Sequence, residues 1–155
     1  MGVLKKKVDN IIGAVLMAGL MVLIGHYGPM VMRELLPSDY YVQIKDLVVE
    51  AMPDTLIIEI DRWVRDDYPV KVMISVYRKD DGINELFSIS NDGILQAGRQ
   101  VYTISIPTPR PLDLGQYYYA NVFFDVDVGQ GVKRRLSVLT PFFKVGEKTS
   151  CLPKW

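Results

Sequence analysis

The longest apolar stretch of the chain lies near its N-terminus. From Ile11 to Met32 the sequence is apolar on all faces of a helix, and His26 is its only acidic or basic residue. As an α-helix this stretch would be about 33 Å long, at about 1.5 Å per residue. Because the hydrocarbon core of a bilayer is about 30 Å thick, the pattern predicts a transmembrane helix with its extension over 11–36, after a basic segment, 1–10.

The residues around this stretch favour a retained anchor over a cleaved signal. Signal cleavage needs two small residues two positions apart, but Gly25 lies two positions after Leu23, and Gly28 lies two positions after His26. The end of the stretch also lacks a cysteine that could carry a lipid. The lysines at 5–7 precede the span, so we expect a cytoplasmic N-terminus and a β domain in the periplasm, on the cell surface or in a virion.

Two prolines and a row of small residues give the predicted helix further features. Pro29 lacks a backbone donor and is expected to kink or end the helix, and Pro37 is expected to stop it. Three small residues lie on one face and would allow a second helix to approach closely. They are Ala14, Ala18 and Gly25.

After Ser38 the apolar period changes from helical to alternating, which predicts β-strands. Strands are expected at 55–64 and 70–78, where every second residue is apolar. In the first strand, which begins near Val42, the apolar phase slips by one residue at Lys45. Such a slip predicts a β-bulge, because without one the second half of the strand would turn its apolar side to water.

Four more strands and a short one near Ile94 follow, separated by turn signals. The strands are predicted at 85–90, 100–106, 116–127 and 132–145, and the turns at 80–82, 91–93, 107–111 and 129–131. About seven strands without helices between them predict an antiparallel, immunoglobulin-like or fibronectin-like β-sandwich. We place this domain at 38–146 and treat 147–155 as a C-terminal tail, too polar for the core.

The segment LDLGQYYYANVFFDV, 112–126, resembles the tyrosine corner of immunoglobulin-like and fibronectin-like sandwiches, with the pattern Asp-x-Gly-x-Tyr ending at Tyr117. In those families the tyrosine hydroxyl bonds to upstream backbone and fixes the loop between the sheets. The resemblance implies this role for Tyr117, although the apolar alternation begins at Tyr118 and would turn Tyr117 outward. The chain departs from the family in having no cysteine pair and in carrying Trp63 in its second strand.

Charge and cysteine content narrow the classes of function. The chain has 18 basic and 18 acidic residues, and without the lysines at 5–7 the remainder is slightly acidic. It therefore lacks the basic face that nucleic-acid binding needs. Cys151 is the only cysteine, which excludes an intrachain disulfide and leaves a bridge between chains, a free thiol or an inert tail residue.

The sequence carries no catalytic pattern, so we expect neither an enzyme nor a cofactor. The single histidine, His26, lies at the predicted membrane boundary and cannot serve a serine or cysteine nucleophile in the β domain. One cysteine and one histidine are too few for a zinc site. Carboxylates in two loops give a calcium alternative, because Ca²⁺ favours several oxygen ligands. They are Asp66, Asp67, Asp125 and Asp127.

Loops on a rigid sandwich are common places for contact with a partner, and Trp, Arg and Tyr often dominate interface energies. The candidates are Trp63, Arg65, Tyr68, Gln130 and Trp155. The chain is thus interpreted as a single-pass membrane protein with a structural or assembly role, whose β domain contacts a protein partner or a second copy. The alternatives are a pilin-like filament subunit with a hydrophobic N-terminal helix, and a tethered module that binds a ligand or calcium.

Overall fold

The computed structural model describes residues 2–81 and 84–151. The chain forms two compact units, Met1–Leu36 and Pro37–Trp155, which are described separately. The first is a single helix, and the second is a two-layered β-sandwich.

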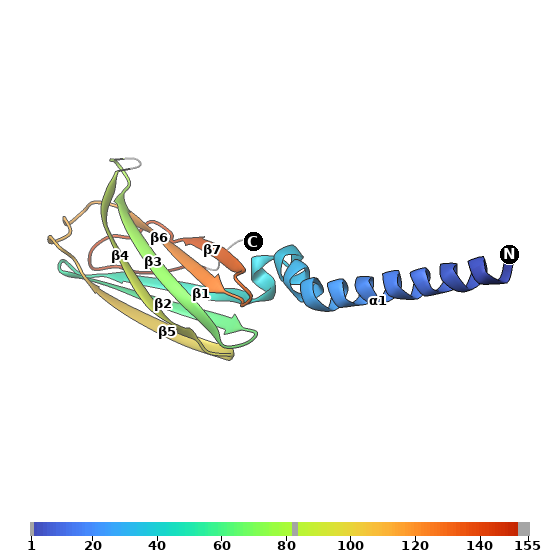
Figure 1. Cartoon of the computed structure of the whole chain (residues 1–155). Coiled ribbons are helices and arrows are strands. Elements are labelled where there is room, and N and C mark those ends of the chain that lie inside the picture. The colour runs from blue at the N-terminus through green and yellow to red at the C-terminus, as the bar shows by residue number, and fades with distance from the viewer. Residues whose placement is uncertain (1, 82–83, 152–155) are drawn as a thin grey trace. The chain divides into compact units, whose positions relative to one another are not determined.

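The helix α1 extends from Gly2 to Leu35 and continues through Pro29 (Figure 1). The helix does not end at Pro29, because the residues after it have helical character and continue it to Leu35. Within it, the 23 residues Gly13–Leu35 are long and apolar enough to cross a membrane, and none of the described side chains there is buried. Signal sequences near an N-terminus have the same properties. The predicted stop is confirmed, because α1 ends two residues before Pro37.

The second unit begins with a short 3-10 helix, η1 (Ser38–Tyr40), and continues as eight strands. The strands are β1 (Val42–Ala51), β2 (Thr55–Val64), β3 (Tyr68–Arg78), β4 (Glu85–Leu95), β5 (Gly98–Pro107), β6 (Tyr118–Asp127), β7 (Lys133–Leu139) and β8 (Lys148–Cys151). One sheet has the order β5-β2-β1-β8 and the other β4-β3-β6-β7, and all neighbours are antiparallel. This confirms the sandwich, and its central strand order is that of immunoglobulin-like folds.

Alternation along the strands places the apolar side chains between the two sheets. The inward residues predicted for β2 and β3 are all buried, namely Leu56, Ile58, Ile60, Val70, Val72, Ile74 and Val76. From β6, Phe124 and Val122 fill the centre of the core and have no exposed surface. Burying alternate residues of both sheets is the main stabilising term of such a fold.

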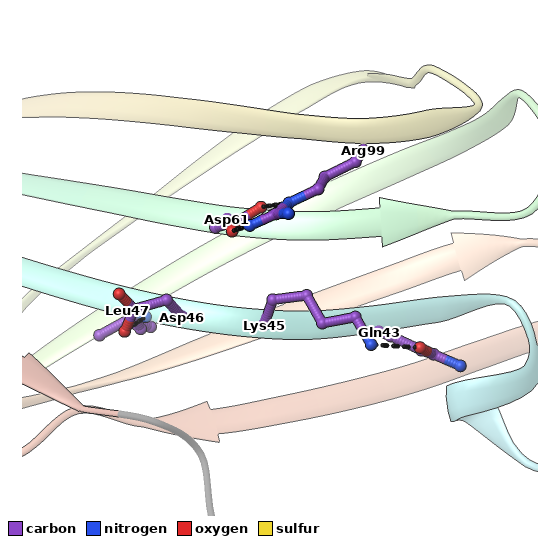
Figure 2. Close-up of polar contacts among 6 residues, drawn as sticks. All are labelled: Gln43, Lys45, Asp46, Leu47, Asp61 and Arg99. Atoms are coloured by element: carbon purple, nitrogen blue, oxygen red, sulfur yellow. Dashed lines mark hydrogen bonds and ion pairs between the residues drawn. The ribbon is translucent and has the colours of Figure 1, made fainter.

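The predicted bulge in β1 is confirmed, because the register with β2 shifts between Ile44 and Asp46. Next to the bulge, the Asp46 Oδ1 atom accepts a hydrogen bond from the Leu47 N–H at 2.8 Å (Figure 2). The shift allows Ile44 and Leu47, three residues apart, both to point into the core. Beside it, an ion pair of 2.6 Å between Arg99 and Asp61 joins β5 to β2.

Two details of the strand assignment differ from the expectation. The turn predicted at 91–93 is wrong, since β4 continues through Asn91 and Gly93 in regular pairing with β3. Backbone pairing with a long neighbour here outweighs the local turn preference of those residues. An eighth strand, β8, lies in the segment expected to be a tail, where it pairs with β1. Its described side chains, 148–150, remain outside the core, because an edge strand needs only backbone hydrogen bonds.

We call the end of the sandwich where β1 begins the proximal end. The end where β1 finishes is the distal end. The proximal end also holds η1 and the loops 65–67 and 128–132. The distal end holds the connections 52–54, 108–117 and 140–147.

Candidate functional site

A buried tyrosine organises the distal end. The Tyr118 hydroxyl accepts a hydrogen bond from the Asp113 N–H at 2.8 Å and donates to the Asp113 carbonyl at 3.5 Å. Tyr118 is 1% exposed. These contacts are those of a tyrosine corner, which fixes the connection between β5 and β6. The role implied for Tyr117 was wrong by one residue, because the inward set of β6 begins at Tyr118.

With Tyr118 turned inward, Tyr117 lies outside and joins other aromatic residues on the outer face of the β3–β6 pair. The Tyr77 and Tyr119 rings stack at 5.0 Å, and the Phe142 ring meets Tyr119 edge to face at 5.8 Å. Phe142 is 51% exposed and Tyr117 is 40% exposed. We call this surface, with two neighbouring lysines, the aromatic–lysine patch. It comprises Tyr77, Lys79, Tyr117, Tyr119, Phe142 and Lys144.

The connection after β7 presents Phe142 outward while burying its neighbour. Thr140 is buried, and its Oγ1 atom accepts a hydrogen bond from the Ala120 N–H at 2.8 Å. Phe143 then exchanges two backbone hydrogen bonds of 2.9 Å with Tyr118 and is fully buried. Phe142, directly before the buried Phe143, instead faces solvent.

Both lysines lie over aromatic ring faces, where a cation is attracted by the ring quadrupole. The Lys144 Nζ atom is 4.2 Å from the Tyr117 ring centroid, and Lys79 Nζ is 4.9 Å from that of Phe142. A hydrogen bond with the Tyr117 side chain raises the pKa of Lys144. The patch therefore combines exposed apolar rings with positive charge, a composition suited to a partner with aromatic and acidic side chains.

Four of the five interface residues predicted from the sequence lie at the proximal end, away from this patch. Arg65 is exposed, and its guanidinium carbon is 4.1 Å from the Tyr40 ring centroid. Tyr68 is buried with its ring against Tyr41, so it belongs to the core and not to the surface. The remaining three are Trp63, half-buried on β2, Gln130, exposed with a left-handed φ of 57°, and Trp155, outside the described residues.

The three small residues of α1 are exposed to solvent. They are Ala14, Ala18 and Gly25. A Cβ atom added at Gly25 would meet nothing within 4 Å. The row therefore leaves room for a close neighbour, although its role stays a prediction.

The four carboxylates of the calcium alternative do not form a cluster. Asp67 accepts the Ala97 N–H at 2.8 Å, and Asp127 accepts the Gly129 N–H at 2.8 Å. Asp125 makes two hydrogen bonds to Arg135, of 2.6 and 2.9 Å, while Asp66 is exposed in its loop. Within 2–81 and 84–151, no group of three or more His, Cys, Asp or Glu residues is placed to hold a metal ion.

Sequence reasoning missed the aromatic–lysine patch, because its members are distributed over 77–144 and none forms a motif with its neighbours. The run of three tyrosines at 117–119 was visible, but only the register of β6 shows which rings point outward. Phe142 was expected inside the strand predicted at 132–145, but β7 ends before it, at Leu139.

Comparisons with known proteins concern the architecture alone. No protein-family model matches the sequence, and no curated protein matches it. A β-glucuronidase of Bacteroides uniformis is 14% identical with a TM-score of 0.45, over 63% of this chain and 13% of the enzyme chain. The C-terminal domain of Wzt is 12% identical with a TM-score of 0.48, over 71% of this chain and 76% of that domain.

A third similar structure is a catalytically inactive OgpA from Akkermansia muciniphila in complex with an O-glycopeptide. It is 10% identical with a TM-score of 0.45, over 72% of this chain and 30% of that chain. The chain thus spans only a small part of the enzymes that it resembles, and the similarity extends to β-sandwich domains only.

Proposed function

We propose that this chain is a single-pass membrane protein without catalytic activity, whose sandwich binds a protein partner on the extracytoplasmic side in a structural or assembly role. The observation that carries the proposal is the aromatic–lysine patch. Two of its rings, Tyr117 and Phe142, are exposed and do not belong to the core. Aromatic residues are enriched at protein interfaces, and exposed apolar patches rimmed by charge are typical of contact surfaces.

The membrane part of the proposal is supported by α1. Its apolar residues, 13–35, are not buried, so their exposure to water would oppose folding unless a bilayer or another apolar surface covers them. The lysines at 5–7 support a cytoplasmic N-terminus. An uncleaved span of this kind would hold the sandwich close to the outer surface of the membrane.

Site-directed photocross-linking of the full chain in its native membrane tests the contact role. A photoreactive phenylalanine analogue at Phe142 should give a discrete adduct, either with a partner or with a second copy. The same analogue at Val101, which is exposed on the other sheet, is the control and should give none. Reversing the charge of one patch lysine, Lys144→Glu, should reduce the Phe142 adduct because it removes the cation that would attract acidic groups.

Recovery of only the uncross-linked monomer at Phe142 would refute the contact role. Equal adducts at Phe142 and Val101 would also refute it, since they would reflect random collision and not a defined surface.

A further inference from the structure

An arginine lies inside the sandwich, where an apolar residue would be expected. Arg62 belongs to the inward-facing set of β2 and is 3% exposed. Among the described residues, no acceptor forms a hydrogen bond with its Nε or Nη1 atom. Its guanidinium lies 4.9 Å from the centroid of the Tyr102 ring, on β5.

This arrangement is costly for a charged group. Burial lowers the pKa of Arg62, but arginine keeps its charge in proteins because its pKa is so high. Within the described ranges, no carboxylate lies at ion-pair distance from Arg62. The Tyr102 ring compensates only in part, since a cation–π contact leaves the guanidinium donors unused. Buried charges are normally paired with an opposite charge, so an anion bound next to Arg62 would stabilise it.

A hollow of about 150 Å³ adjoins Arg62 between the edge strands of the two sheets. Its walls come from β3 and β5 through Val70, Val72 and Tyr102, and from β4 through Asn91 to Leu95. The opposite edge of the hollow is thus formed by the stretch of β4 that the sequence predicted to be a turn.

The residues of β4 explain why the hollow exists. Gly93 pairs with Val70 and Asn91 pairs with Val72, so both occupy inward positions. A Cβ atom added at Gly93 would meet nothing within 4 Å, and its φ is not in the left-handed region. The backbone therefore does not require glycine there. A glycine inside a regular strand often marks the close approach of a ligand or another backbone.

We propose that this hollow is a binding site for a single carboxylate group, with the Arg62 guanidinium as its charged ligand. The planar fork of arginine matches the two oxygens of a carboxylate. The Asn91 amide lines the same hollow and could add a hydrogen bond, and Val70 and Val72 provide an apolar wall for the carbon chain that carries the group. This site is independent of the aromatic–lysine patch and adds a ligand chemistry to the proposed contact role.

The test is a titration of the isotope-labelled full chain in detergent micelles with sodium propionate, observed through the Arg62 Nε–H resonance. Loss of this resonance in the Arg62→Met variant identifies it. We expect a saturable shift with propionate and none with sodium chloride at the same ionic strength.

Two variants separate binding from folding. Gly93→Leu fills the hollow while leaving residue 62 unchanged, and it should weaken propionate binding at least about tenfold, which corresponds to about 1.4 kcal/mol. Ser90→Val, on the exposed outer face of the same strand, is its matched control and should bind as the unchanged chain does. Arg62→Met, which lacks the observed resonance, should keep its thermal midpoint or raise it, because an apolar residue of similar volume replaces a buried charge.

The source of the carboxylate is distinguished by a short blocked peptide whose only charge is a central glutamate. Tighter binding of the peptide than of propionate assigns the carboxylate to an acidic side chain of a protein, and the reverse assigns it to a small free acid. Both outcomes support the site. A resonance that responds equally to propionate and chloride would overturn it, as would undiminished propionate binding by a folded Gly93→Leu variant. If only the Phe142 cross-link failed, the contact role would be refuted but the carboxylate site would not.

Discussion

Two adjacent tyrosines, Tyr117 and Tyr118, have opposite environments because β6 begins between them. The hydroxyl of Tyr118 is held by the backbone of Asp113, whereas the ring of Tyr117 is exposed beneath Lys144. The same chemical group therefore stabilises the fold at one position and forms a surface at the next.

We expect Tyr118→Phe to lower the free energy of unfolding by about 1–2 kcal/mol, because it leaves the Asp113 N–H without its acceptor in a part-buried position. Tyr117→Phe removes the same atom at an exposed position and should change stability by less than about 0.5 kcal/mol. Chemical denaturation of both variants measures the difference. Equal losses would contradict the assignment of the tyrosine corner to Tyr118.

At the residue scale, the sequence predicted the motif but not its member. The alternation from Tyr118 to Val126 indicated that Tyr117 points outward, while the spacing from Asp113 pointed to Tyr117 itself. Neighbouring residues differ only in the side of the strand that they occupy, so a register error of one residue exchanges their roles. Arg62 illustrates a second limit, because an arginine in an alternating strand gives no local sign that it lies inside.

The strand pair β6–β7 is held on its outer face by an ion pair between Asp125 and Arg135, with distances of 2.6 and 2.9 Å. The two residues are direct partners in the antiparallel register. The hydrogen bond with Arg135 lowers the pKa of Asp125. Cross-strand pairs of opposite charge stabilise a sheet modestly, and solvent reduces this pair's contribution further.

The pair should stabilise the sandwich only slightly at neutral pH, because solvent screens it. Because the folded pKa of Asp125 is below the unfolded value of about 3.9, this contribution is present above pH 3.9 and is lost as the pH falls through the folded pKa. A double-mutant cycle with Asp125→Asn and Arg135→Gln, measured by denaturation near neutral pH and again well below pH 3.9, checks this. A coupling energy that does not fall in acid would be inconsistent with the ion pair.

At the scale of elements, β4 and β8 show what local pattern does not contain. Asn91, Asp92 and Gly93 have the composition of a turn, and Lys148 to Ser150 that of a polar tail, yet both stretches are strands. Each lies at an edge and pairs with a single neighbour, β3 or β1. Edge strands depend on backbone hydrogen bonds more than on apolar side chains, so alternation is a poor guide to them. The central strands β2, β3 and β6 bury one face, and their pattern predicted them.

For the whole molecule, the two units differ in whether their apolar side chains are buried or exposed. The sandwich buries its apolar residues between two sheets, whereas the described apolar side chains of α1 from Gly13 to Leu35 are uncovered. An apolar helix of this length is compatible with a bilayer and poorly compatible with water.

We expect the full chain, expressed in a bacterium, to stay in the membrane pellet after alkaline extraction and to keep its full mass in mass spectrometry. The double variant Leu16→Asp and Leu23→Asp should be released, because each acidic group near the centre of a span costs roughly 2.5–3.5 kcal/mol. Val101→Asp, on the exposed face of β5, is the control for added charge and should remain in the pellet. A soluble chain that has lost its N-terminal segment would instead identify a cleaved signal.

The sequence by itself determined the apolar helix, the sandwich class, the bulge at Lys45 and the inward residues of the central strands. These features follow from the periodicity of neighbouring residues, which burial imposes on helix and strand directly. Only the tertiary structure decided which tyrosine closes the corner, that Tyr77, Tyr119 and Phe142 share one surface, and that the hollow left by Gly93 adjoins Arg62. These features join residues that are distant in the chain, and their positions depend on strand order and register, which no local pattern specifies.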